Sequence, residues 1–186
     1  MNQYAIAGGK TAGVCLAAFL LVVLAHLLTA SAIERRGERE IYEHLGGLAP
    51  GRAFGLFTPV SGNDPIQGFY PAWYGPEKTE SYIVAVQGTG YKGPLSLLVH
   101  CGANGEILAA RLLKNQEIPG MGKNAETKGY MNKFLGTGAT KPVPLDPRDL
   151  SPQDAEAVCG VSITFGGIAR AIEKASAFIK AGGGRR

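Results

Sequence analysis

The sequence predicts an α+β fold, in which a twisted antiparallel sheet with flanking helices is tethered by one amino-terminal transmembrane helix. Three features of the 186-residue chain support this fold class: an opening apolar run, short apolar segments joined by turn residues, and a closing segment with helical periodicity. We expect a short tail at 1–10, the membrane helix at 11–33, a connecting region at 34–80, the folded domain at 81–180 and a flexible tail at 181–186.

The opening run, TAGVCLAAFLLVVLAHLLTASAI at 11–33, contains no acidic or basic residue apart from His26. As a helix it would span about 32 to 35 Å, enough to cross a hydrocarbon core of about 30 Å. A cleaved signal peptide is the alternative, because Lys10 precedes the run and ASA at 30–32 resembles a cleavage site. The run is longer than the apolar part of a signal peptide, so we expect a membrane anchor.

The positive charges around this segment bear on its orientation. Arg35, Arg36 and Arg39 follow the run, whereas Lys10 precedes it. Because positive residues favour the cytoplasmic side of a membrane, this count places the larger part of the chain in the cytoplasm. A resemblance carried by the closing segment of the chain implies the opposite side.

Composition argues against two other kinds of site. The net charge of +4 comes from scattered basic residues without interleaved aromatic residues, so we expect no nucleic-acid partner. The three cysteines have no zinc or iron–sulfur spacing, so we expect no metal. Cys101 and Cys159 are either a disulfide or two buried free thiols, and the second interpretation is the commoner outcome for a lone pair.

The connecting region begins with helical periodicity. Ile33, Ile41 and Leu45 recur at helical spacing in a charged setting, and Gly46-Gly47 is expected to end this helix. Residues 49–80 are rich in glycine, proline and aromatic residues without a clear period. FYPAWYGPE within them is either an interfacial loop or a segment that covers the core, and we favour the second because aromatic side chains usually pack inward.

The middle of the chain predicts antiparallel strands at 81–87, 95–101 and 106–113, and Asn104-Gly105 is a strong signal for a hairpin between the last two. A helix is expected at 124–135, with its inward residues Tyr130, Met131 and Phe134. Ser151 is expected to cap a short helical turn with Pro152 at its first position and Asp154 at its third.

The closing helix is expected to begin at about Thr164 or Phe165, with one apolar stripe formed by Ile168, Ile172, Ala175 and Ile179. Ser162 then lies just before a helix amino terminus. Free backbone N–H groups and the positive end of the helix dipole favour a phosphate there, and neighbouring glycines permit close approach. Plain helix capping is the alternative role for these hydroxyl residues.

The segment EAVCGVSITFGG resembles the SGATxT flavinylation motif of FMN-binding domains, as found in the G subunit of the Rnf electron-transport complex and the C subunit of the sodium-pumping NADH:quinone oxidoreductase. In that family an acidic residue precedes the motif, and a threonine carries FMN through a phosphoester installed by a flavin transferase. Here Glu156 matches the acidic position, Gly160 the glycine, Ser162 the attachment residue and Thr164 the second threonine. The chain departs from the family pattern at four positions: Cys159, Val161, Ser162 and Phe165.

The upstream sequence supports this resemblance. GTGYKGP and the loop from Glu117 to Gly122 are similar to a glycine–tyrosine turn and an ETPGLG loop of the family. The resemblance implies that Glu117, Tyr91, Lys92, Gly160 and Val161 belong to the flavin site, beside a covalent attachment at Ser162.

The resemblance implies an electron carrier in a membrane complex, not a stand-alone catalyst. FMN would be its cofactor, and the other subunits of an Rnf-type complex, a flavin transferase and the bilayer its partners. The folded domain would lie on the extracytoplasmic side of the cytoplasmic membrane. A flavin-free scaffold subunit is the alternative, and a serine hydrolase is a weaker one, because Thr164 replaces the second glycine of the G-x-S-x-G elbow.

Overall fold

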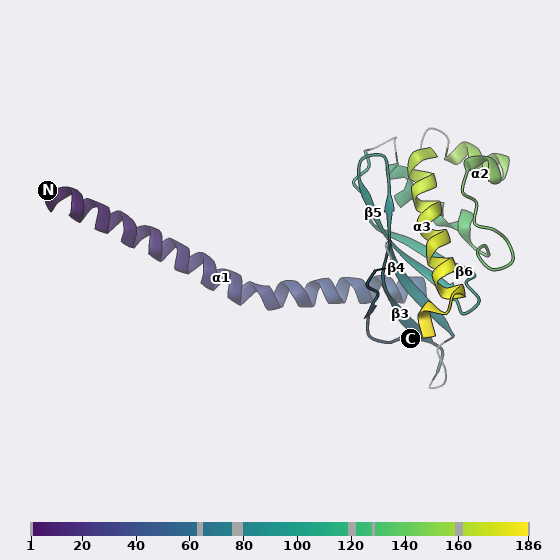
Figure 1. Ribbon diagram of the computed structural model, residues 1–186, viewed down its shortest axis with the longest axis horizontal. Coiled ribbons are helices and arrows are strands. Elements are labelled where there is room, and N and C mark those ends of the chain that lie inside the picture. The colour runs from purple at the N-terminus through teal and green to yellow at the C-terminus, as the bar shows by residue number, and fades with distance from the viewer. Residues whose placement is uncertain are drawn as a thin grey trace. The chain divides into compact units, whose positions relative to one another are not determined.

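The computed structural model describes residues 2–62, 65–75, 80–118, 122–127, 129–158 and 162–185, with side chains in the first helix described at 8, 10, 12–28, 37 and 39–48. The chain divides into two compact units, residues 1–43 and 44–186. Figure 1 shows the helix that opens the chain and, in the second unit, a sheet with a helix on one face.

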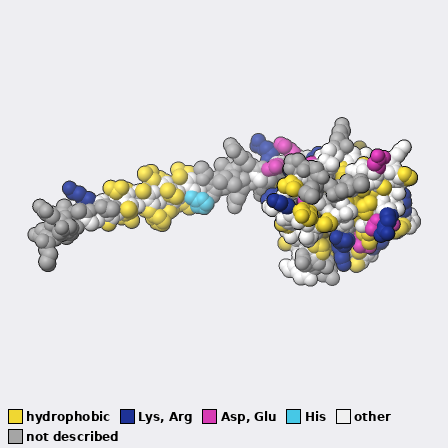
Figure 2. All heavy atoms as spheres, turned by 90° about the horizontal axis from the view of Figure 1, so that it is seen from above, with side chains coloured by type: hydrophobic (Ala, Val, Ile, Leu, Met, Phe, Trp, Pro, Cys, Tyr) yellow, Lys and Arg dark blue, Asp and Glu magenta, His cyan; other side chains and the backbone are white. Residues whose placement is uncertain are grey.

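The first helix, α1 (Asn2–Leu48), runs without a break through the expected membrane segment and the expected charged helix after it. It includes Gly46-Gly47, which were expected to end it, and stops one residue later at Leu48. Hydrophobic side chains gather along much of its described part (Figure 2), and the large apolar residues from Val14 to Leu28 are exposed. Judged by length and hydropathy, none of the helices over the described residues qualifies as a membrane span.

The sheet of the second unit is antiparallel throughout, with strand order β1-β3-β4-β5-β6 and β2 paired with β3. Its strands are β1 (Ala53–Phe54), β2 (Thr58–Pro59), β3 (Ile66–Trp73), β4 (Ser81–Thr89), β5 (Pro94–Gly102) and β6 (Ile107–Lys114). The last three confirm the predicted strands, and the turn at Asn104 and Gly105 joins β5 to β6 as expected.

Strand β3 is a correction to the sequence prediction, which placed no regular element in 49–80. Gly68 and Pro71 obscured it, because both residues are unfavourable inside strands. The structure gives Gly68 a specific reason: a Cβ at this position would lie 2.5 Å from the carbonyl oxygen of Thr58. Phe69 of the same strand is buried in the core, which agrees with the interpretation of this aromatic segment as packing material.

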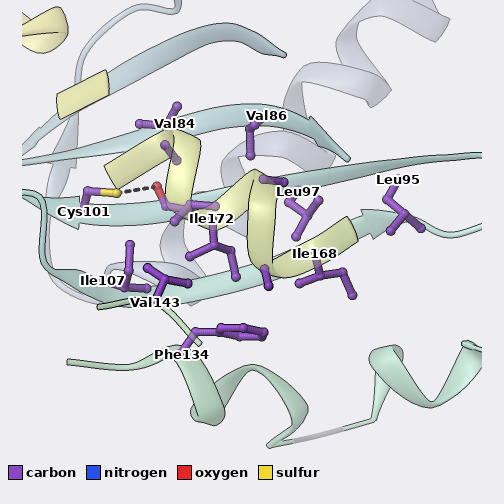
Figure 3. Packing of buried hydrophobic residues seen from close by; sticks show 14 of the residues in the cluster. Val84, Val86, Leu95, Leu97, Cys101, Ile107, Phe134, Val143, Ile168 and Ile172 are labelled. Carbon is purple, nitrogen blue, oxygen red and sulfur yellow. Dashed lines mark hydrogen bonds between the residues drawn. The ribbon is translucent and has the colours of Figure 1, made fainter. Parts of the chain in front are cut away.

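The main core lies between the sheet and α3 (Ser162–Lys180), which covers one face of β4 and β5 (Figure 1). Figure 3 shows Ile168 and Ile172 of α3 among side chains from the strands. All members of the predicted apolar stripe are buried: Ile168, Ile172, Ala175 and Ile179. The thiol of Cys101 donates to the carbonyl of Val99 (3.8 Å) within this core, and burial raises its pKa to about 12. Cys159, its possible partner, lies outside the described residues.

The last turn of α1, from His44 to Leu48, covers part of the opposite face of the sheet. Leu45 is fully buried, and the His44 ring lies 3.1 Å from the guanidinium of Arg111 in β6. His100 of β5 points to this face, where its Nε2 lies 2.9 Å from the hydroxyl of Ser81. Because alternate residues of a strand face opposite sides, His100 and Cys101 contribute to different layers.

The expected helix at 124–135 is instead two short 3₁₀ helices, η1 (Lys123–Glu126) and η2 (Tyr130–Phe134). Gly129 separates them with a φ of 90°, a left-handed conformation that interrupts an α-helix. Tyr130 and Phe134 are buried, as predicted. After η3 (Pro147–Asp149), Ser151 caps α2 (Pro152–Ala157) by accepting from the Asp154 N–H (3.3 Å), also as predicted, and η4 (Gly183–Arg185) follows α3.

Candidate functional site

The amino terminus of α3 presents two hydroxyl residues in different environments. The helix begins at Ser162, two residues before the expected start, and Ser162 is exposed. Thr164 is only 1% exposed and lies on the core side. Two residues along a helix correspond to about 200° of rotation, so these hydroxyl groups face in different directions. Phe165, fully buried, stacks on Phe134 with ring centroids 5.4 Å apart and fixes this turn against the core.

The loop after β6 passes next to Thr164. A Cβ at Gly122 would lie 2.8 Å from Thr164 Oγ1 and 2.8 Å from Glu117 Cγ, so a larger residue cannot occupy this position without movement. Its φ of 143° also disfavours residues with a side chain. Gly122 therefore allows Glu117, which follows a strand, and Thr164, which begins a helix, to lie close together.

Glu117 is the one carboxylate among the buried residues of the described chain, at 5% exposure. Its Oε1 accepts from the backbone N–H of Lys92 (3.1 Å), whereas its Oε2 has no hydrogen-bond partner among the described residues. An unpaired buried oxygen is costly, and native structures normally satisfy it with a protein group, water or ligand. Glu117 thus has one acceptor position that a ligand can fill.

Asn115 holds the start of this loop in place. Its Oδ1 accepts from the Glu117 N–H (2.9 Å), and its Nδ2 donates to the carbonyl of Gly122 (3.2 Å). Asn115 was not among the predicted site residues. An asparagine two residues before a backbone donor is a local signal for such a turn, but the contact with Gly122 requires the folded loop.

The turn between β4 and β5 forms the other side of the site. Gly90 donates to the carbonyl of Gly93 (2.8 Å), and a side chain at Gly90 would overlap the carboxylate of Glu117. Lys92 takes part through its backbone. Tyr91, which the resemblance placed in the flavin site, has a 57% exposed side chain.

Other expected site residues are not brought together by the described structure. Glu156 lies in α2 and is exposed. Gly160 and Val161 lie outside the described residues, as do Cys159 and the part of the predicted loop at 119–121. Over the part of the chain that the structure describes, no group of three or more His, Cys, Asp or Glu residues is arranged to hold a metal.

Arg170 is a second residue that was not predicted from the sequence. Its guanidinium lies beside Gly166, where Nη1 would be 3.4 Å from a Cβ on that glycine. A cavity of about 180 Å³ adjoins it, between α3 and the end of β4, and its lining includes Thr89, Gly167 and Lys174. The only feature of the sequence that could have indicated Arg170 is its spacing. Ser162, Gly166 and Arg170 are four residues apart, which places them on one face of a helix.

Comparison with known proteins finds a family model and several relatives that match this chain. Residues 90–177 match the model of the FMN-binding domain family. The chain is 24% identical to the G subunit of a proton-translocating ferredoxin:NAD(+) oxidoreductase complex of Clostridium ljungdahlii, covering 55% of this chain and 57% of the relative. It is also 26% identical to the G subunit of the ion-translocating oxidoreductase complex of Yersinia pestis, over 73% of this chain and 59% of the relative. The identity to the corresponding G subunit of Vibrio atlanticus is 26% as well, over 64% of this chain and 63% of the relative.

The matched parts therefore span less than two thirds of these relatives' own length. The family model covers the β4–β5 turn, the Glu117 loop, both hydroxyl residues and most of α3. These elements build the site described above, and the family match identifies FMN as the cofactor. Residues 90–177 of this chain are thus similar to the FMN-binding domain family.

Proposed function

We propose that the chain is a membrane-anchored flavoprotein subunit that carries electrons in an Rnf-type ion-translocating complex, with FMN esterified to Ser162. One observation supports the attachment above others. The exposed hydroxyl of Ser162 stands at the first residue of a long helix, whose next residues contact the buried loop of Glu117 and Gly122. The names of the relatives supply the kind of complex.

The residues present fit a phosphate ester at this position. The first backbone N–H groups of α3 have no partners within the helix, and the helix dipole adds positive potential at the same end. Ser162 offers the same nucleophilic oxygen as the threonine of the family motif. In the ester an Oγ–P bond replaces the O–H bond of Ser162. A flavin transferase would catalyse this step with an activated flavin diphosphate as donor, whose P–O bond to its leaving group breaks as the serine proton is released.

Glu117 and Thr164 would support the bound group from the core side. The unpaired Oε2 of Glu117 can accept a hydrogen bond from a flavin N–H or a ribityl hydroxyl. Thr164 is buried next to Gly122, which suits support of the loop and not attachment. When bound, FMN supplies the redox chemistry, and the protein fixes its place and its electrostatic surroundings.

Membrane anchoring is the second part of the proposal. The run at 11–33 lies in one continuous helix, and its described large apolar side chains, Val14 to Leu28, are exposed. An exposed apolar helix of this kind is stabilised by lipid. We place the domain on the extracytoplasmic side, as the resemblance implies and against the arginine count, with the other subunits of the complex as its partners.

The test is to express the full-length chain with an active flavin transferase and to look for flavin that survives denaturation. We expect in-gel fluorescence, and an intact mass raised by one FMN minus one water. Ser162→Ala should lose both signals, whereas Ser162→Thr should keep them. Thr164→Val, a substitution of similar volume, is the matched control and should remain labelled.

Each alternative predicts a different result. Label that persists in Ser162→Ala and vanishes in Thr164→Val would move the attachment to Thr164. A wild-type chain without flavin, while the transferase labels a control protein, would favour the flavin-free scaffold.

A further inference from the structure

The amino-terminal half of α3 places one positive side chain in line with Ser162. Ser162, Gly166 and Arg170 are spaced four residues apart, so they form a continuous ridge on the helix surface. Long helical side chains lean toward the amino terminus of their helix. The guanidinium of Arg170 does so: it lies beside Gly166, with Nη1 and Nη2 at 3.4 and 3.5 Å from the position of a Cβ there.

Gly166 has no side chain between the guanidinium of Arg170 and the helix backbone, and a Cβ there would be in ordinary van der Waals contact with this group. The three nearest atoms that a Cβ at Gly166 would meet beyond the helix backbone all belong to the guanidinium of Arg170. Glycine is otherwise less favourable than alanine inside a helix. Gly166 and Ser162 are about 6 Å apart along the helix axis. A phosphate ester on Ser162 would bring its oxygens closer to the guanidinium of Arg170 than the serine hydroxyl is.

The electrostatic surroundings of Arg170 favour an anion. Arg170 makes no hydrogen bond or ion pair with another residue of the described part of the chain, and its side chain is exposed. The adjoining cavity of about 180 Å³ is lined by a second cation, Lys174, and by no acidic residue that the structure describes. A hollow bordered by charges of one sign attracts ligands of the opposite sign.

A separate observation indicates a ligand at this end of the helix. The carboxylate of Glu117 is buried, and its Oε2 is unpaired among the described residues. Gly122 brings Glu117 next to Thr164 in the first turn of α3. The orphan oxygen does not depend on Arg170 and lies on a different element.

We propose that Arg170 binds the phosphate of the flavin esterified to Ser162, with its guanidinium lying along the helix beside Gly166. The proposal rests on the attachment proposed above. Arginine suits this role, because its planar group offers two parallel N–H donors to phosphate oxygens. Arg170 is then a positioning residue, which holds the anion while the flavin ring remains free to exchange electrons.

The test compares flavin-loaded and unloaded forms of the full-length chain by thermal unfolding and by ³¹P NMR of the ester. We expect loading to raise the Tm of the wild-type protein. Arg170→Gln should lose most of this rise and shift the ³¹P resonance, and Arg170→Lys should recover part of it. Lys174→Gln removes the same charge one turn further from Ser162 and should have a much smaller effect than Arg170→Gln on both measurements.

Gly166→Val provides a second variant that keeps both cations. Its side chain would occupy the space of the Arg170 guanidinium, so it should resemble Arg170→Gln in both measurements. Equal effects of Arg170→Gln and Lys174→Gln, or no effect of either, would overturn the role of Arg170 while the label on wild-type protein still supports attachment. Absence of any mass gain on the wild-type chain would overturn the proposed function itself, and this inference with it.

Discussion

Gly167 of α3 touches the backbone of Thr89 at the end of β4, so closely that a Cβ on Gly167 would overlap the Thr89 carbonyl oxygen. Helix and strand backbones meet directly at this point, without an intervening side chain. The contact holds the first turns of α3 against the β4–β5 turn, whose Lys92 N–H binds Glu117.

Gly167→Ala should therefore destabilise the domain, despite the better helix propensity of alanine. Overpacking against a backbone group typically costs about 1 to 3 kcal/mol. Gly166→Ala is the matched control, because its Cβ would first meet the flexible end of Arg170, at 3.4 Å. It should be neutral or slightly stabilising. Urea unfolding followed by the fluorescence of Trp73 measures both, and equal stabilities would contradict the tight contact.

Phe165→Ala should cost about 3 to 5 kcal/mol, the usual cost of removing a large core side chain. Phe165 is fully buried and stacks on Phe134, whereas its near neighbour Ile163 is 56% exposed. Ile163→Ala should change the stability by no more than about 0.5 kcal/mol. Denaturation of the two variants under the same conditions checks the pair, and a large effect at Ile163 would show that this face is covered.

His100 should make the stability depend on pH below neutrality. Burial, and then the positive charge of Arg52, lower its pKa to about 4, although a backbone hydrogen bond to Leu48 opposes the change. Between about pH 6.5 and 4 the unfolded chain binds a proton that the folded chain does not, so the free energy of unfolding falls as the pH falls. The shift corresponds to at most about 3 kcal/mol.

His100→Gln should flatten this pH dependence while keeping a polar group near Ser81. The difference in unfolding free energy between wild type and variant, measured from pH 7.5 to 4, isolates His100 from the carboxylates that titrate in the same range. A difference that stays constant across the range would contradict a lowered pKa.

Glu117→Ala should release the turn after β4. It leaves the Lys92 N–H without its acceptor. Losing the partner of a fully buried donor costs about 1 to 3 kcal/mol, and we expect a smaller loss of stability here because this hydrogen bond is only half-buried. Glu117→Gln retains an acceptor oxygen and should stay close to wild type in stability. Hydrogen exchange at the Lys92 amide distinguishes the two, and unchanged protection in Glu117→Ala would place the donor's true partner elsewhere.

The side of the membrane can be tested at an exposed loop position. Ser61→Cys should react with a membrane-impermeant thiol reagent in intact spheroplasts if the domain is extracytoplasmic, and the unaltered chain serves as the background control. Reaction only after lysis would favour a cytoplasmic location of the domain, as the arginine count implies.

We expect the amino-terminal segment to remain attached to the mature protein. Amino-terminal sequencing that begins at Ile33 would show a cleaved signal peptide in place of an anchor.

The sequence predicted those elements whose pattern is local. Strands β4 to β6 alternate or run apolar between strong turn residues, and the stripe of α3 is regular. Strand β3 was missed because Gly68 and Pro71 are both unfavourable in strands, and the close neighbours that explain Gly68 are supplied only by the fold. The periodicity of 124–135 indicated one α-helix. Gly129 alone did not predict that the segment forms two 3₁₀ helices.

The site divides in the same way. Ser162 was selected because a hydroxyl before a helix is visible in sequence, and its motif resembles a known one. The contact of Glu117 with the Thr164 region depends on a loop crossing that joins distant parts of the chain, so the resemblance could name both residues but not their packing. Asn115 and Arg170 belong to no motif and emerged only from the hydrogen bonds and the space beside Gly166.

If Ser162 carries the flavin as proposed, the different orientations of Ser162 and Thr164 allow the domain to fold before it is modified. Thr164 is sealed when α3 docks, so an enzyme could modify it only before folding or after the first turn unwinds. Ser162 stays accessible on the finished domain. A modifying enzyme can thus act on a chain that is already folded, and acceptance by that enzyme becomes a check that α3 has reached its native position.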